Sequence, residues 1–246
     1  MNPETYDIFS RQIPYLGMKK QDMLLRSKVV VVGCGGLGSF VTSMLVRSGV
    51  GFVRVIDHDV VEESNLHRVS LFNGEDIGKS KAFLAEKRLK NINPEGRVEG
   101  IEDNLNPANA EKLLSGFDVV VDCSDNREVR YLINRFCFKN EKPWVYGSIL
   151  RDKGVSSTFS PEGRPCFACL YPRKPRPGAI PLCSVEGVLS PIAGMIASWE
   201  VMEVIKLLTK ISEPNYKKLL RIRLKKPKFE FLNIRAKRNC EVCGKK

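Results

Sequence analysis

The sequence lacks the segments that export a chain or hold it in a membrane. Residues 1–12 contain Glu4 and Asp7 and no sustained apolar run, unlike a secretory signal peptide. The most apolar late stretch, residues 187–208, is interrupted by Pro191, Glu200 and Glu203, which is typical of a core or interface helix rather than a transmembrane span. These absences predict a cytoplasmic protein without a membrane partner.

An aromatic platform for nucleic acid is also missing, although the chain of 246 residues carries a formal net charge of +12. The basic clusters at 173–176, 221–228 and 235–238 have no interleaved row of aromatic residues, so a nucleic-acid partner is not expected. The charge indicates either a solvated basic surface or a surface that attracts an acidic protein.

A run of four valines at 29–32, uninterrupted by charge, predicts a strand buried on both faces, as in a parallel sheet. Glycines follow at 33, 35 and 38, in the spacing G-x-G-x-x-G, and a helix is predicted over 37–48. These glycines allow a tight turn and a close approach of a diphosphate to backbone N–H groups. A second predicted strand, residues 52–56, ends at Asp57, where a ribose-binding carboxylate is expected. The pattern therefore predicts a nucleotide-binding loop, but it does not identify the nucleotide.

Strand and helix patterns alternate through residue 159, which predicts an α/β fold: a Rossmann-like, mostly parallel sheet with helices on both faces. Further helices are expected near 23–25 and over 79–91, 107–114, 126–139 and 188–208. Further strands are expected at 97–103, 117–122, 144–149, 155–159, 217–224 and 228–234. No repeat interrupts the chain, and we predict one domain over 1–246. Its parts are an N-terminal arm at 1–27, a nucleotide-binding core at 28–159, and a C-terminal portion at 160–246.

Two C-x-x-C pairs, Cys166/Cys169 and Cys240/Cys243, lie about 70 residues apart and predict a four-thiolate structural zinc site. Such a site would staple the C-terminal portion to the rest of the domain. Disulfides are the first alternative and are disfavoured in a reducing compartment. A redox pair is the second, and we expect neither pair to open a helix after a strand.

The other cysteines divide into two kinds. Cys34, Cys123 and Cys137 are expected to be small buried apolar residues. Cys183 follows a proline-rich loop at 172–181 and precedes the predicted long helix, whose N-terminus would lower the pKa of the thiol. Cys183 is therefore the candidate nucleophile, and an inert loop cysteine is the alternative.

Several spaced motifs resemble those of the ThiF/MoeB/HesA family, the ubiquitin-activating-like adenylyltransferases. They are Arg11-Gln-Ile in the arm, Asp57-His-Asp-Val-Val-Glu-Glu-Ser-Asn-Leu-His-Arg68, Gly78-Lys-Ser-Lys81, Asp122-Cys-Ser-Asp-Asn126, both C-x-x-C pairs and the segment 183–188. The resemblance covers almost the whole chain. It implies that the fold binds ATP rather than NAD.

By this resemblance, Asp57 binds the ribose, Asn65, Arg68 and Lys81 bind the phosphates, and Asp125 carries Mg²⁺. Arg11 would reach the ATP of a partner subunit, which implies a homodimer. The implied catalytic residues are Arg11, Arg68, Lys81, Asp125 and Cys183. The residues implied for nucleotide binding are Gly33, Gly35, Gly36, Gly38, Asp57, Asn65, Arg68, Lys81, Asp125 and Asn126, and the zinc ligands are Cys166, Cys169, Cys240 and Cys243.

The reaction that the resemblance implies is adenylation of the C-terminal glycine carboxylate of a small ubiquitin-like sulfur-carrier protein ending in Gly-Gly. It releases pyrophosphate and would serve molybdopterin, thiamine or thiolated-tRNA biosynthesis or protein conjugation. Cofactors would be ATP, Mg²⁺ and Zn²⁺, and sulfur would come from a separate sulfurtransferase.

The chain departs from the family pattern at two positions: Val69 replaces a frequent glutamine, and Ser124 replaces threonine. Two alternative functions remain. One is activation of a small-molecule or tRNA-attached carboxylate, as in threonylcarbamoyladenosine dehydratases, and the other is a nucleotide-binding scaffold without turnover.

Overall fold

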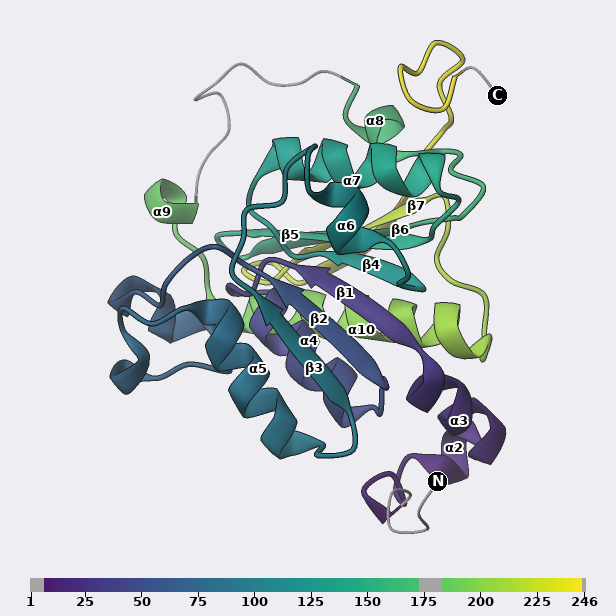
Figure 1. The fold of residues 1–246 in the computed structure, drawn as a ribbon. Helices are drawn as coiled ribbons and strands as arrows, with labels where there is room; N and C mark the ends of the chain where they lie inside the picture. Colours follow the sequence, from purple (N-terminus) through teal and green to yellow (C-terminus); the bar gives the residue numbers. More distant parts are fainter. Residues whose placement is uncertain (1–6, 173–182, 245–246) are drawn as a thin grey trace.

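The computed structural model describes residues 7–172 and 183–244, together forming an α/β fold around one eight-stranded sheet (Figure 1). The strand order is β3-β2-β1-β4-β5-β6-β7-β8. Strands β1 (Lys28–Val32), β2 (Phe52–Ile56), β3 (Arg97–Ile101), β4 (Val119–Asp122) and β5 (Trp144–Leu150) run parallel. The valine run is fully buried, as its sequence predicts.

The last three strands, β6 (Lys153–Phe159), β7 (Lys218–Arg223) and β8 (Lys228–Asn233), extend the sheet in antiparallel order. Only Arg151 and Asp152 separate β5 from β6, and a link this short permits a hairpin but no crossover. The alternating pattern of the core did not indicate this antiparallel extension.

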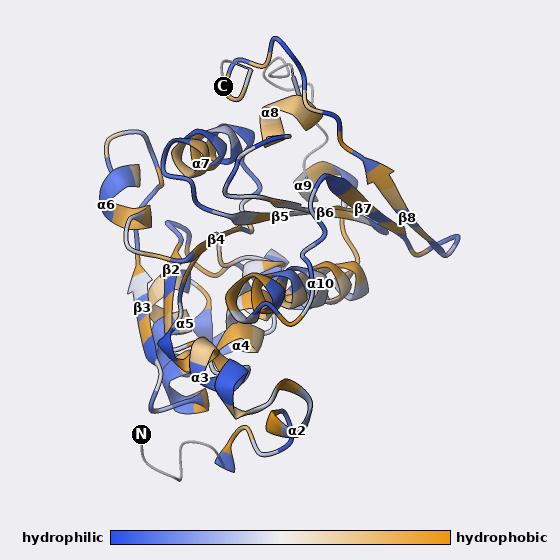
Figure 2. Ribbon diagram, turned by 90° about the vertical axis from the view of Figure 1, so that its right-hand side faces the viewer, coloured by the Kyte–Doolittle hydropathy of each residue, from blue (hydrophilic) through white to orange (hydrophobic). Residues whose placement is uncertain are grey.

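Helices cover both faces of the sheet, as predicted (Figure 2). One face carries α4 (Gly38–Arg47), α5 (Lys81–Ile92) and α10 (Ser190–Thr209), and the other carries α6 (Ala110–Leu114), α7 (Arg127–Lys139) and α8 (Phe167–Leu170). Apolar residues on each face form a buried core against the sheet. None of the helices in the described ranges is both long enough and apolar enough to cross a membrane.

Helix α5 begins at Lys81 rather than 79, and two further helices also begin two or three residues later than the sequence indicates. Helix α6 starts at Ala110 rather than 107, because the Asn106 side chain accepts a hydrogen bond from Ala108 N and holds a turn there. Helix α10 starts at Ser190 rather than 188, because Val188 forms a β-bridge with Arg151.

The N-terminal arm, α2 (Ile13–Leu16) and α3 (Met18–Arg26), leads directly into β1 at the amino ends of the parallel strands (Figure 1). Gln12 Nε2 fixes the arm by donating to Gln21 Oε1 at 2.7 Å and to the Ser48 carbonyl at 2.9 Å. The short helices η1 (Glu63–Arg68) and η2 (Gly74–Asp76) follow β2 instead, at the carboxyl edge of the sheet. The arm and these helices therefore lie at opposite edges.

Candidate functional site

The glycine loop after β1 is held by two close backbone approaches that exclude any side chain. A Cβ atom on Gly38 would lie 1.9 Å from the Gly33 carbonyl oxygen, and one on Gly33 would lie 2.8 Å from that of Cys123. Gly33 also has a φ of 92°, which favours glycine. A Cβ on Gly35 would meet nothing within 4 Å. The loop is therefore tight at its two ends and open at its middle, where a ligand could approach the backbone.

Asp57 follows β2 and faces this loop. Its carboxylate is only 7% exposed and accepts hydrogen bonds from Cys34 N at 2.5 Å and from Asp59 N at 2.8 Å. Burial raises the pKa of Asp57, while these two backbone donors oppose the shift. Asp57 thus ties the glycine loop to the segment after β2, at the position predicted from the sequence.

Lys81, the first residue of α5, points back toward this segment. Its Nζ donates to Asp59 Oδ2 at 3.0 Å, and its side chain is 7% exposed whereas that of Asp59 is 55% exposed. His58 Nε2 lies 3.3 Å from the other Asp59 oxygen. The family motifs contain both residues but imply a role only for Lys81, whereas the structure shows that Asp59 holds the ammonium group in place.

The helix η1 carries Asn65 and Arg68. Asn65 is buried, and its Oδ1 accepts from Glu62 N at 3.4 Å, which caps the helix. A Cβ on Gly36 would lie 3.5 Å from the Arg68 side chain, so this cation lies against the glycine loop. Arg68 also donates to the Ser64 carbonyl at 2.6 Å.

The turn between β4 and α7 holds the second pair of predicted site residues. Asp125 is exposed, and Asn126 caps α7 by accepting from Glu128 N at 2.8 Å. Behind them, Arg130 Nε lies 3.3 Å from the fully buried Asp122 Oδ2. Burial raises the pKa of Asp122 to about 6 against the opposing charge of Arg130, and Ser124 donates to Asp122 as well. Arg130 fixes the turn, a role that the motif alone did not indicate.

A further buried acid, Glu200 of α10, lies behind β5. A Cβ on Gly147 would be 2.5 Å from the Glu200 carboxyl group, and neither Glu200 oxygen has a hydrogen-bond partner within the described ranges. Burial, and then the nearby charge of Asp122, raise the pKa of Glu200 well above its ordinary value, while Arg130 opposes them. Sequence reasoning noted Glu200 only as an interruption of an apolar run.

Arg11 is not brought to this edge. It is exposed on the arm, at the amino ends of the parallel strands, whereas the glycine loop, Asp57 and Asp125 follow their carboxyl ends. Within one chain, the fold therefore separates Arg11 from the other predicted site residues.

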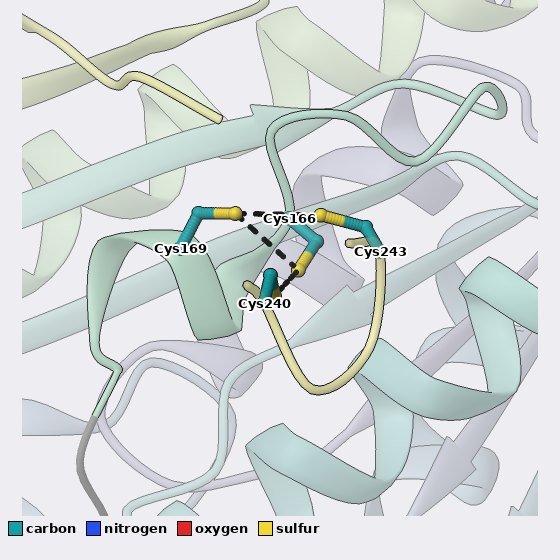
Figure 3. A group of neighbouring side chains, drawn as sticks. All are labelled: Cys166, Cys169, Cys240 and Cys243. Atoms are coloured by element: carbon teal, nitrogen blue, oxygen red, sulfur yellow. Dashed lines mark hydrogen bonds between the residues drawn. The ribbon is translucent and has the colours of Figure 1, made fainter. Parts of the chain in front are cut away.

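The four cysteines of the C-x-x-C pairs are buried together (Figure 3). Sγ atoms of Cys166 and Cys240 are 3.5 Å apart, those of Cys169 and Cys243 are 3.4 Å apart, and all four lie within 4.8 Å of one another. Zinc–sulfur bonds of about 2.3 Å in a tetrahedron place sulfur atoms about 3.8 Å apart. The donor set and its spacing therefore fit zinc.

The pKa shifts in this cluster differ from one cysteine to another. Burial raises the pKa of Cys166 and raises that of Cys243 to about 11, whereas backbone donors outweigh burial and lower the pKa of Cys240. One expectation was wrong: Cys166 does precede a helix, the single turn α8, because its carbonyl accepts the Cys169 and Leu170 N–H groups. The four-sulfur cluster nevertheless distinguishes this arrangement from an isolated redox pair.

The remaining cysteines partly follow expectation. Cys34, Cys123 and Cys137 are free and buried, and burial raises the pKa of each. Cys183 begins α9 (Cys183–Glu186), a separate four-residue helix, and the long helix starts only at Ser190. The predicted placement at the N-terminus of the long helix is therefore wrong, because Gly187 has a φ of 76° and ends α9. The expected loop at 172–181 lies outside the described residues except for Pro172.

Together, these elements form an anion-binding edge with separate tasks for its groups. An open glycine loop, two cationic side chains and an exposed carboxylate surround the ends of β1, β2 and β4. Backbone N–H groups and cations bind phosphates, and a free carboxylate can bind a divalent cation. The arrangement can bind a nucleoside triphosphate with its metal.

Comparisons with known proteins agree with this description. The ThiF family matches residues 9–243. The chain is 40% identical over 248 residues to a sulfur carrier protein adenylyltransferase of Thermus thermophilus, covering 98% of this chain and 92% of that protein. It is 39% identical over 240 residues to a SAMP-activating enzyme E1 of Haloferax volcanii, covering 97% and 88%. The crystal structure of E. coli MccB with ATP superposes with a TM-score of 0.83 at 26% identity, over 99% of this chain and 75% of that one.

Proposed function

The chain belongs to the ThiF family, and we propose from that premise that it is an ATP-dependent adenylyltransferase acting on a small ubiquitin-like sulfur-carrier protein. The observation that carries the proposal is the 40% identity, over 98% of this chain, to a sulfur carrier protein adenylyltransferase. The anion-binding edge supports it, because its residue types suit ATP.

ATP would lie across the glycine loop, with Asp57 accepting hydrogen bonds from the ribose hydroxyls. Asn65, Arg68 and Lys81 would bind the phosphates, and Asp125 would hold Mg²⁺, which supplies positive charge at the phosphates. The same assignment keeps Gly33, Gly35, Gly36, Gly38 and Asn126 as nucleotide-binding positions. The Asp59–Lys81 and Asp122–Arg130 contacts hold this set in position before ATP arrives.

In the proposed reaction, a carboxylate oxygen of the terminal glycine attacks the α-phosphorus, a new P–O bond forms and the bond to pyrophosphate breaks. Both reactants are anions, so catalysis consists mainly of positioning and of charge neutralisation by Arg68 and Lys81. No general base is needed, because the carboxylate is ionised at neutral pH.

Arg11 supports a homodimer in which it completes the partner's site. It is exposed and lies at the opposite sheet edge from its own chain's glycine loop, which supports a role in a site on another subunit. A guanidinium supplied from outside the site can neutralise charge that develops on the transferring phosphate, as arginine fingers do.

For the cysteine cluster we propose structural zinc bound by Cys166, Cys169, Cys240 and Cys243. The supporting observations are four buried sulfur atoms within 4.8 Å of one another. A closed tetrahedral site would staple the end of the chain to α8, completing one domain over residues 1–246. Such a site leaves no open position for chemistry.

ATP–pyrophosphate exchange tests the proposal. With a small ubiquitin-like protein ending in Gly-Gly, we expect exchange that disappears when the terminal glycine is removed from that protein. Exchange driven instead by a small carboxylic acid or a tRNA-attached carboxylate would establish the alternative enzyme. ATP binding without pyrophosphate exchange with any of these substrates would leave only the alternative of a nucleotide-binding scaffold.

A further inference from the structure

The linker between α9 and α10, residues 187–189, is hydrogen-bonded to the tip of the β5–β6 hairpin. Arg151 N donates to the Gly187 carbonyl at 2.8 Å, and Leu189 N donates to the Arg151 carbonyl at 2.9 Å. An Arg151–Glu186 ion pair adds a side-chain contact. Val188 thus forms a single β-bridge with Arg151, while Leu189 of the linker and Val185 of α9 are 57% and 80% exposed.

A second contact to the linker comes from helix η1. His67 Nε2 lies 3.3 Å from the Val188 carbonyl oxygen, across 121 positions of sequence. With its proton on Nε2, the imidazole donates a hydrogen bond to this carbonyl. His67 precedes Arg68 in the six-residue helix η1, which also carries Asn65. One helix thus bears two phosphate-binding candidates and the side chain that holds the linker.

We propose that His67 is a positioning residue that couples the phosphate-binding helix η1 to the linker that follows Cys183. The proposal rests on the proposed adenylyltransferase function. Because His67 and Arg68 are neighbours in η1, a movement of this helix on phosphate binding would reach the linker through the His67–Val188 contact. A carrier tail that lies along the linker is thereby aligned with the α-phosphate only when ATP is in place.

Alignment matters because the attacking oxygen must stand close to the phosphorus, and a displacement of about 1 Å can cost roughly a hundredfold in rate. The His67–Val188 contact itself is exposed to solvent, so we expect its loss to lower the rate by less than a hundredfold. A single neutral hydrogen bond corresponds to about a two- to tenfold change in an equilibrium. The backbone pairing with Arg151 would keep the linker folded when His67 is removed.

Hydrogen exchange tests the His67–Val188 contact without any substrate. In His67→Ala, amides of residues 185–190 should exchange about two- to tenfold faster than in the parent. His67→Gln should restore the parental rate, because the glutamine Nε2 occupies a similar place and donates. His58→Ala is the matched control: it removes the chain's other histidine, which contacts Asp59 rather than the linker, and should leave these amides unchanged.

Steady-state exchange kinetics then test the coupling. We expect His67→Ala to lower kcat/KM for the carrier about two- to tenfold while the KM for ATP stays within about twofold, with recovery in His67→Gln. Unchanged amide exchange in His67→Ala, or an effect confined to the KM for ATP, overturns the proposed role of His67. A parent enzyme that shows no ATP–pyrophosphate exchange with any carrier refutes the proposed function instead. Amide hydrogen exchange then still tests the His67–Val188 contact.

Discussion

Replacing the buried Glu200 with glutamine should stabilise the protein at neutral pH. Burial raises the pKa of Glu200 in the folded state, whereas in the unfolded chain it titrates near its ordinary value of 4.5. Above pH 4.5 the unfolded chain releases this proton and the folded chain keeps it, so the folded state binds more protons. The free energy of unfolding therefore falls as pH rises through this window.

The free energy of unfolding falls by about 1.4 kcal/mol per pH unit while Glu200 stays protonated in the folded state. Parent and Glu200→Gln should be nearly equal in stability near pH 4.5, because both side chains are then neutral. By pH 7 the variant should be more stable by up to about 3 kcal/mol, which is a rise of roughly 5–10 °C in Tm for a domain of this size. Asp122 titrates in both proteins, so the difference between them isolates Glu200.

Urea unfolding at pH 5, 6, 7 and 8 measures this difference, and Glu203→Gln is the matched control on the same helix. Glu203 is equally buried, but it accepts hydrogen bonds from Thr158 Oγ1, Asn215 N and Lys206 Nζ. Its replacement should destabilise the protein by about 1–3 kcal/mol. A Glu200→Gln variant that is less stable than the parent at pH 7, or that has the same pH dependence, would refute the reasoning.

Three further predictions concern the proposed site. Asp125→Ala and Arg11→Ala should each abolish ATP–pyrophosphate exchange, and mixing them should restore activity, since each mixed dimer has one complete site; proven heterodimers without activity would remove Arg11 from the partner's site. Elemental analysis should find one zinc per chain, and Cys240→Ser should lower Tm more than it lowers turnover per folded molecule; an active protein free of metal would exclude the zinc site. Cys183→Ala should keep exchange but lose any covalent adduct with the carrier that reductant or hydroxylamine cleaves; an adduct mapped to Cys34, Cys123 or Cys137 would reassign the nucleophile.

The sequence was informative wherever local chemistry determines structure. The valine run, the glycine spacing and Asp57 predict the strand, the tight loop and the carboxylate beside it, because these signals lie close together in the sequence, although the loop also packs against Cys123. The two C-x-x-C pairs were equally informative, since thiolates at that spacing have few other uses.

Features that depend on tertiary pairing were missed. The antiparallel addition of β6, β7 and β8 follows from the two-residue link at Arg151 and Asp152, and no periodicity in the sequence marks that link as a hairpin. Gly187 ends α9 with a φ of 76°, and the long helix starts two residues late because Val188 pairs with Arg151. Glu200 and His67 acquire their contacts from segments more than 50 residues away, and neither belongs to a motif whose spacing would indicate those contacts.

The central claim is that the enzyme transfers an adenylyl group to a terminal glycine carboxylate. Intact-mass spectrometry of a Gly-Gly-ended ubiquitin-like protein, incubated with the enzyme, ATP and Mg²⁺ in the presence of pyrophosphatase, tests it directly. The account predicts that the carrier gains the mass of one adenylyl group, and that it gains none with Asp125→Ala enzyme or without its last glycine. A carrier that instead gains one phosphoryl group, with release of ADP, would contradict it.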